Sequence, residues 1–193
     1  AIVVMLMAGA AFGAGTLTEK SPLKTPATRA GSSATDTTGA LFWFDGNVQR
    51  PLFADPVLVA EVHPSDETKA LILAADPSAQ IVSSRGVRLW KVTSTAQMLS
   101  KVAGLLPVLR DQASGAGKAR VAAGDVVVQL DPAVDAAAFL KENGLEKKRE
   151  VGTLAIVIAA PAGYDAIRLA NRLHGLPGVK LAMPNWWVAA KAK

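Results

Sequence analysis

Residues 124–185 read GDVVVQLDPAVDAAAFLKENGLEKKREVGTLAIVIAAPAGYDAIRLANRLHGLPGVKLAMPN, and this stretch decides the fold. Its pattern predicts the order strand–helix–strand–strand–helix–strand. The strands are short runs rich in Val, Leu and Ile, at 125–130, 145–151, 154–159 and 179–183. The helices end at glycine-bearing stop signals, at 134–142 and 164–174. Two helices on one face of a four-stranded antiparallel sheet leave the other face open.

Residues 55–111 carry a less regular copy of this pattern. Its expected strands are 57–62, 80–84, 87–92 and 106–109, and its expected helices are 66–75, with Ser65 as cap, and 95–103. We therefore predict an α+β chain of two tandem ferredoxin-like units, at 55–111 and 124–185. A small, polar, glycine-bearing linker, 112–123, joins them. Each unit has only about 60 residues and is expected to be marginally stable alone.

Three further segments precede the first unit. Residues 41–54, LFWFDGNVQRPLFA, predict a β-hairpin around Asp45-Gly46, since Asp-Gly between apolar runs favours a tight turn. Residues 15–40 are rich in Thr, Ser, Pro and Gly and predict a flexible linker. Residues 1–14 begin with the apolar run AIVVMLMAGAAF and predict a signal-peptide remnant, so the expected location is secreted or periplasmic. A buried N-terminal helix is the alternative; the run is too short for a stable membrane span.

Composition excludes several classes of function. The chain has no cysteine, which rules out disulfides, iron–sulfur clusters and thiolate zinc sites. Its two histidines, His63 and His174, lie in unrelated settings, so we expect neither a metal site nor a cofactor. The net charge of +5 is spread along the chain, and its densest run is Lys147-Lys148-Arg149, which is typical of a solvated face. We expect no nucleic-acid partner.

No catalytic motif is present. Gly115-Ala116-Gly117-Lys118 lacks the first glycine and the Ser or Thr of a phosphate-binding loop, and no GxSxG elbow occurs. The sequence therefore predicts that this chain alone is not an enzyme.

The second unit resembles the inhibitor-type propeptides of bacterial subtilisin-like serine proteases. The resemblance lies in the run VVVQL followed by Asp131-Pro132, in Asn143-Gly144-Leu145, and in the ending of the unit. That ending matches the family pattern L-x-G-V-x-x-A-x-P-N at Leu176, Gly178, Val179, Ala182, Pro184 and Asn185. The resemblance as a whole covers about a third of the chain. The catalytic motifs of these proteases are absent from the sequence.

The resemblance implies a secreted protease precursor in which this region aids folding and temporarily blocks the active site. The open sheet face would pack on two surface helices of a subtilisin-like catalytic domain, in cis or in trans. The tail 186–193 would lie in the cleft as an extended strand: Val188, Ala189, Ala190, Lys191, Ala192 and Lys193. Trp186 and Trp187 would contact the protease or, equally, cap the chain's own core. Glu150 would cap helix N-termini of the protease, unless it only balances its basic neighbours.

Three other functions stay open. A free-standing protease inhibitor differs from a pro-region only in whether the gene encodes a catalytic domain after Lys193. A tandem ferredoxin-like regulatory domain would bind a small molecule between its units. An exported enzyme would need a convergent acid–base pair, which the sequence does not display.

Overall fold

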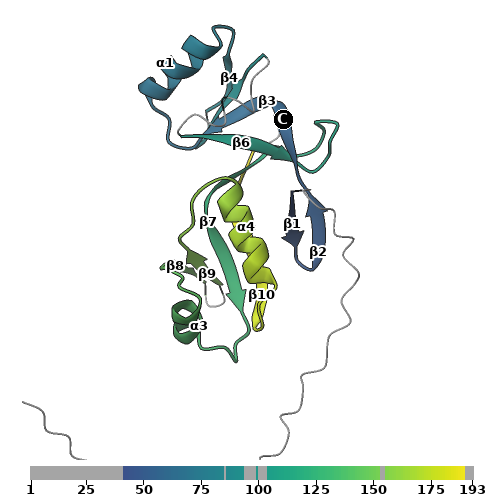
Figure 1. The fold of residues 1–193 in the computed structure, drawn as a ribbon, viewed down its shortest axis with the longest axis vertical. Coiled ribbons are helices and arrows are strands. Elements are labelled where there is room, and N and C mark those ends of the chain that lie inside the picture. The colour runs from purple at the N-terminus through teal and green to yellow at the C-terminus, as the bar shows by residue number, and fades with distance from the viewer. Residues whose placement is uncertain (1–40, 85, 94–98, 100–103, 153–154, 190–193) are drawn as a thin grey trace, which may run out of the picture. The chain divides into compact units, whose positions relative to one another are not determined.

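The computed structural model describes residues 41–84, 86–93, 99, 104–152 and 155–189. The predicted signal-peptide remnant, the linker 15–40 and nearly all of the predicted helix 95–103 lie outside this part. The described residues form an α+β fold with antiparallel strand pairing, which confirms the predicted class (Figure 1). No helix within the described residues is long and apolar enough to cross a membrane.

A hairpin opens the described chain. Strands β1 (Phe42–Asp45) and β2 (Val48–Pro51) pair antiparallel, with Asp45 opposite Val48. Gly46 occupies the turn at φ 61°, a left-handed conformation that glycine adopts without the penalty of a β-carbon. The hairpin predicted around Asp45-Gly46 is confirmed.

The remaining strands form one eight-stranded sheet. They are β3 (Phe53–Glu61), β4 (Gln80–Ser83), β5 (Arg88–Lys91), β6 (Leu105–Arg110), β7 (Arg120–Leu130), β8 (Lys147–Val151), β9 (Ala155–Ile158) and β10 (Val179–Val188). The order is β4-β5-β3-β6-β7-β9-β8, and β10 pairs with β7 as well. The edge strand β8 has four charged residues in succession, KKRE, whereas the edge strand β4, QIVS, has none.

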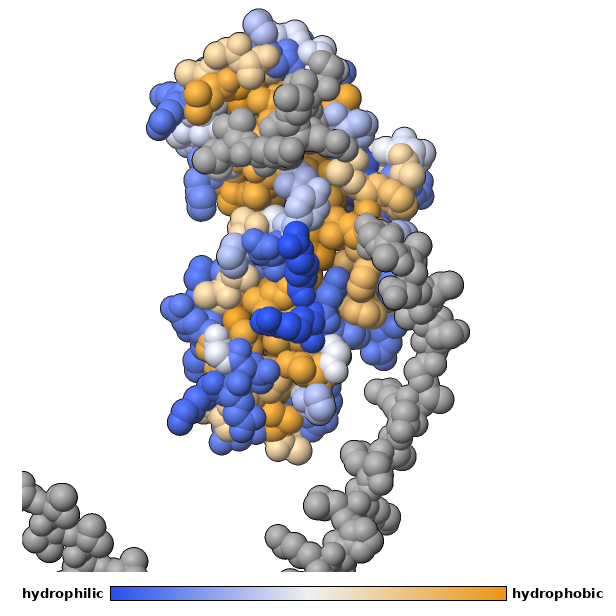
Figure 2. All heavy atoms as spheres, in the orientation of Figure 1, coloured by the Kyte–Doolittle hydropathy of each residue, from blue (hydrophilic) through white to orange (hydrophobic). Residues whose placement is uncertain are grey.

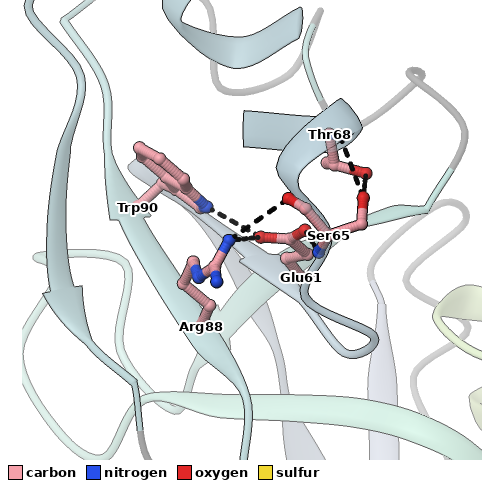
Figure 3. A network of polar contacts seen from close by, with 5 residues as sticks. All are labelled: Glu61, Ser65, Thr68, Arg88 and Trp90. Atoms are coloured by element: carbon pink, nitrogen blue, oxygen red, sulfur yellow. Dashed lines mark hydrogen bonds and ion pairs between the residues drawn. The ribbon is translucent and has the colours of Figure 1, made fainter. Parts of the chain in front are cut away.

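The strands β3 to β6 make up what we call the first half, and β7 to β10 make up the second half, each with the helices between its strands. In the first half, helix α1 (Asp66–Ala75) connects β3 to β4, and the strand order is β4-β5-β3-β6. The predicted cap is confirmed, because the Ser65 hydroxyl accepts a hydrogen bond from the Thr68 amide at 3.0 Å. Figure 3 shows how the fully buried Glu61 fixes this helix start. Its carboxylate accepts from the Ser65 amide at 2.7 Å and from Arg88 and the Trp90 indole, both at 3.2 Å. These bonds offset the cost of removing the charge from water.

Asp76 ties the other end of α1 to the residues just after β5. Its carboxylate accepts hydrogen bonds from the amide and hydroxyl of Ser78 and from the amide and hydroxyl of Thr93. The Ser78 hydroxyl, followed by the Thr93 amide, lowers the pKa of Asp76 from 3.8 to about 2. The helix end and the end of β5 are therefore joined through one ionised side chain.

In the second half, α3 (Ala136–Glu142) connects β7 to β8, and α4 (Tyr164–His174) connects β9 to β10. The Asp135 carboxylate caps α3 by accepting from the amides of Ala137 and Ala138. Helix α4 has the predicted bounds, and its apolar side packs on β7 and β10.

Strand β7 begins at Arg120, although residues 120–123 were expected to be linker. These residues are strand because they pair on both sides: Leu109 of β6 lies opposite Arg120, and Val188 and Trp187 of β10 lie opposite Arg120 and Val121. Val121 and Ala122 are buried, so small side chains here mark packed strand instead of a boundary.

The turn between α4 and β10 provides a test of local strain. Gly178 has φ +80°, and a β-carbon there would lie 2.5 Å from Cγ2 of Val134, whereas Gly144, at φ +62°, has open space around it. We expect Gly144→Ala to cost about 1 kcal/mol from the backbone alone, and Gly178→Ala about 3 kcal/mol because of the added clash. Urea unfolding of both variants measures the difference. Equal costs would contradict the close approach of Val134.

Asp76 predicts an acid-dependent loss of stability. Because its folded pKa is lowered to about 2 from 3.8, its contribution is fully present above about pH 4 and is lost as pH falls through 2. We expect Asp76→Asn to lower the melting temperature at pH 6, and the gap from the unmodified chain to narrow between pH 4 and pH 2. Thermal unfolding followed by circular dichroism measures both. A gap that stays constant with pH would rule out this linkage.

Candidate functional site

The register of the second half sorts its side chains onto two faces. Residues directly opposite each other in antiparallel strands point to the same side of the sheet. Two cross-strand rows lie on the side of the helices: Ala182–Val128–Ile156–Glu150 and Pro184–Val126–Ile158–Lys147. Their central residues are buried beneath α4, where Ile167, Ala170 and Leu173 pack. This is the helix-bearing face.

Two other rows lie on the opposite side, and we call their residues the helix-free face. The rows are Met183–Val127–Val157–Arg149 and Leu181–Gln129–Ala155–Val151. Val157 is buried, Arg149 and Val151 are exposed, and the other five residues are half-buried. The face thus has an apolar centre, with Gln129 and Arg149 as its polar members.

Only one end of this side of the sheet is covered by the chain itself. Val121, near the start of β7, packs with Ala60, Leu89 and Val108 of the first half. Beyond the irregular backbone at Gly124 and Asp125, the two helices of the second half, α3 and α4, both pack on the opposite, helix-bearing face. The side expected to be entirely open is therefore covered at its first-half end and uncovered along Val127 and Met183.

Exposed hydrophobic residues alone do not identify a site. Figure 2 shows that hydrophobic residues also reach the surface on the side drawn there, interleaved with hydrophilic ones. Leu71, Ile81 and Val82 are each about half exposed in the first half. Single exposed apolar residues are normal on soluble proteins. The helix-free face differs because six of its eight side chains, spread over four paired strands, are apolar.

Glu150 lies on the helix-bearing face, opposite Ile156. Its carboxylate accepts a hydrogen bond from Lys147 Nζ at 2.9 Å, and this bond, with the charge of Lys147, lowers the pKa of Glu150. The role predicted for Glu150, capping partner helices, would require a partner that reaches around the edge strand β8. It stays a prediction, and Arg149 is the charged residue that the register places on the helix-free face.

Glu150 also borders a cavity of about 400 Å³ between α3 and the β8–β9 end of the sheet. Its lining combines apolar side chains with two carboxylates: Leu130, Asp131, Pro132, Val134, Ala136, Glu150, Gly152, Ala155 and Ile156. No group of three or more His, Asp or Glu side chains in the described part of the chain could hold a metal ion.

The residues of the family pattern shape the path from α4 into β10. The Gly178 carbonyl accepts from the Asp131 amide at 2.7 Å, and the Leu176 carbonyl accepts from the Val179 amide at 3.2 Å. Ala182 is buried in the core, and Pro184 is buried opposite Val126, while Asn185 is exposed. These positions therefore build the last strand, and their role in this structure is architectural.

The two tryptophans lie inside β10 and contact the chain itself. Trp186 is half-buried against the main core, with its ring 5.5 Å from that of Trp43 in an edge-to-face arrangement. Trp187 packs with the first half. Val188 pairs with Arg120, and the Ala189 amide donates to the Ala119 carbonyl at 3.1 Å. Trp186 thus packs on the chain's own core, and contact of either tryptophan with a protease stays a prediction. Residues 190–193 lie outside the described part.

Sequence reasoning anticipated an open face but named none of its residues. The continuous apolar run Val126-Val127-Val128 cannot show which side chains point away from the helices, because all three are valine. The alternation of apolar and polar residues at the start of β10, Val179-Lys180-Leu181, was the available signal.

Comparison with protein families, curated proteins and solved structures found no significant match to this chain. Its function must therefore be argued from its surfaces.

Val127 and Val128 are adjacent and point to opposite faces, so they test the two-face assignment. Val128→Thr would bury a hydroxyl without a partner and should cost about 2 kcal/mol, whereas Val127→Thr should cost less than about 1 kcal/mol. Urea unfolding of each variant measures these costs. Equal losses would mean that the helix-free face is also buried.

Proposed function

We propose that each half of the chain is a ferredoxin-like unit. The second half supports this with the strand order β8-β9-β7-β10 and with α3 and α4 as its two crossover helices. The first half supports it with the order β4-β5-β3-β6 and with α1. The tandem pair is joined where β6 meets β7.

We propose further that the chain is the pro-region of a secreted subtilisin-like serine protease, acting as intramolecular chaperone and temporary inhibitor. The observation that carries this proposal is the uncovered apolar surface of the helix-free face. Its four strands lie about 4.8 Å apart, so the face is roughly 14 Å wide. Helices pack 8–10 Å apart, so the axes of two neighbouring partner helices would both lie over a face of this width.

A surface of this kind can act during folding as well as after it. The catalytic domains of subtilisin-like proteases contain parallel strands, which pair residues far apart in sequence and therefore fold slowly. A preformed sheet that binds two of their helices lowers the cost of bringing those helices together. The same complex then blocks the active site if the residues after Ala189 enter the cleft as an extended strand.

A free-standing inhibitor would use the same face, and only the gene arrangement separates it from a pro-region. A regulatory domain that binds a small molecule is favoured by a different observation, the cavity beside α3. Its volume of about 400 Å³ falls within the range of small-molecule sites, and its apolar lining with Asp131 and Glu150 would suit a cationic ligand.

The inhibitory role can be tested by titrating the whole chain against several bacterial subtilisins and following hydrolysis of a peptide substrate. We expect inhibition at about micromolar concentration or below. Met183→Glu puts a charge in the centre of the helix-free face and should raise the inhibition constant by about tenfold or more. Ala137→Glu adds the same charge to an exposed position on α3 and should leave it unchanged.

A second variant tests the tail without disturbing the sheet. A chain that ends at Ala189 keeps all of β10, so it should retain binding to the protease but inhibit much less. Full potency of this shortened chain would remove the tail from the mechanism. Absence of any inhibition by the complete chain, across several subtilisins, would contradict the proposed function.

A further inference from the structure

The end of β10 is held from both sides of the sheet. Trp186 and Trp187 are consecutive residues of this strand, so their side chains point to opposite faces. In the pairing with β7, Trp186 lies opposite Ala122 and Trp187 lies opposite Val121. Among described strands, β10 pairs only with β7, so its other edge has no strand partner there. Contacts above and below the sheet must therefore hold this end.

The hairpin β1–β2 supplies the contact on the helix-bearing side. The Trp43 ring packs edge-to-face on Trp186, and the Arg120 guanidinium lies 5.1 Å from the Trp43 ring centre. The hairpin is anchored on α4, because the Asn171 side chain donates to the Phe42 carbonyl at 2.8 Å. The Phe44 ring also stacks on His174 at 4.0 Å. Trp43 is only 5% exposed, so this contact is closely packed.

The first half supplies the contact on the opposite side. Trp187 and Ala189 pack against a cluster that includes Ala60, Leu89 and Val108. The Trp187 indole approaches the backbone at Gly86, where a β-carbon would lie 3.6 Å from Nε1. The loop between β4 and β5 thus reaches the last strand, although it is about a hundred residues distant in sequence.

We propose that the hairpin and the first half form a two-sided clamp on Trp186-Trp187, which fixes the direction in which the chain leaves the sheet after Ala189. This inference rests on the proposed function. It assigns a role to the hairpin and to the first half, which precede the second half in the sequence. A tail that is already held at its base loses less conformational freedom when it binds, so the clamp raises affinity for the protease cleft. The ends of strands otherwise open readily, because few contacts hold them.

Hydrogen exchange measures the clamp without any protease. The Ala189 amide, which donates to the Ala119 carbonyl, reports on the end of β10, and the amides of Val127 and Val128 report on the centre of the sheet. We expect Trp187→Ala and Asn171→Ala each to speed exchange at Ala189 by about tenfold or more, with the centre unchanged. The control variant Val151→Ala lies at the exposed end of β8 and should change the exchange rate neither at Ala189 nor at the centre of the sheet.

Asn171→Ala removes one hydrogen bond and leaves every aromatic ring in place, so it keeps the test usable if Trp187→Ala does not fold. Unchanged exchange at Ala189, or equal acceleration at Ala189 and at the centre, would overturn the clamp. Against a subtilisin, both variants should also inhibit about tenfold less well than the unmodified chain. If the exchange pattern appears but the unmodified chain inhibits no subtilisin, the clamp stands and the proposed function fails.

Discussion

Strand β7 is the element on which the rest of the structure depends. It pairs with β6 and β10 near its start and with β9 and β10 further along, so it belongs to both halves of the sheet. Val121, Val126 and Val128 within it are fully buried. Since side chains alternate along a strand, its register decides which residues of the second half lie under α4 and which face away. A shift of one residue would exchange the two faces.

The same alternation separates two kinds of tryptophan contact at the end of β10. Trp186 joins the core that includes the hairpin, and Trp187 joins the cluster that includes the first half. The hairpin, the first half and the last strand therefore meet within a few residues of each other. The helix-free face begins only beyond this junction, and the proposed partner surface is thereby separated from the contacts that hold the chain together.

Local signals in the sequence were sufficient for most elements and insufficient for their assembly. Ser65 and Gly46 mark a helix start and a turn through chemistry that acts within a few residues, and both were predicted correctly. The extension of β7 to Arg120 was missed because Val121 and Ala122 are strand residues only through pairing with a segment more than sixty residues away. The position of Glu150 was also beyond prediction, because a register shift in β8 decides its face. The contact of Trp186 with Trp43 likewise joins opposite ends of the described chain.

Two of the edge strands, β8 and β4, differ in charge. At β8, four successive charged side chains and the ion pair from Lys147 to Glu150 oppose the approach of another backbone, as charged edges generally do. At β4, Gln80 and Ser83 flank the exposed apolar residues Ile81 and Val82, and no charge intervenes. Of these two edges, β4 is therefore the one that favours addition of a foreign strand. In a concentrated preparation, self-association through these two edges would begin at β4 and not at β8.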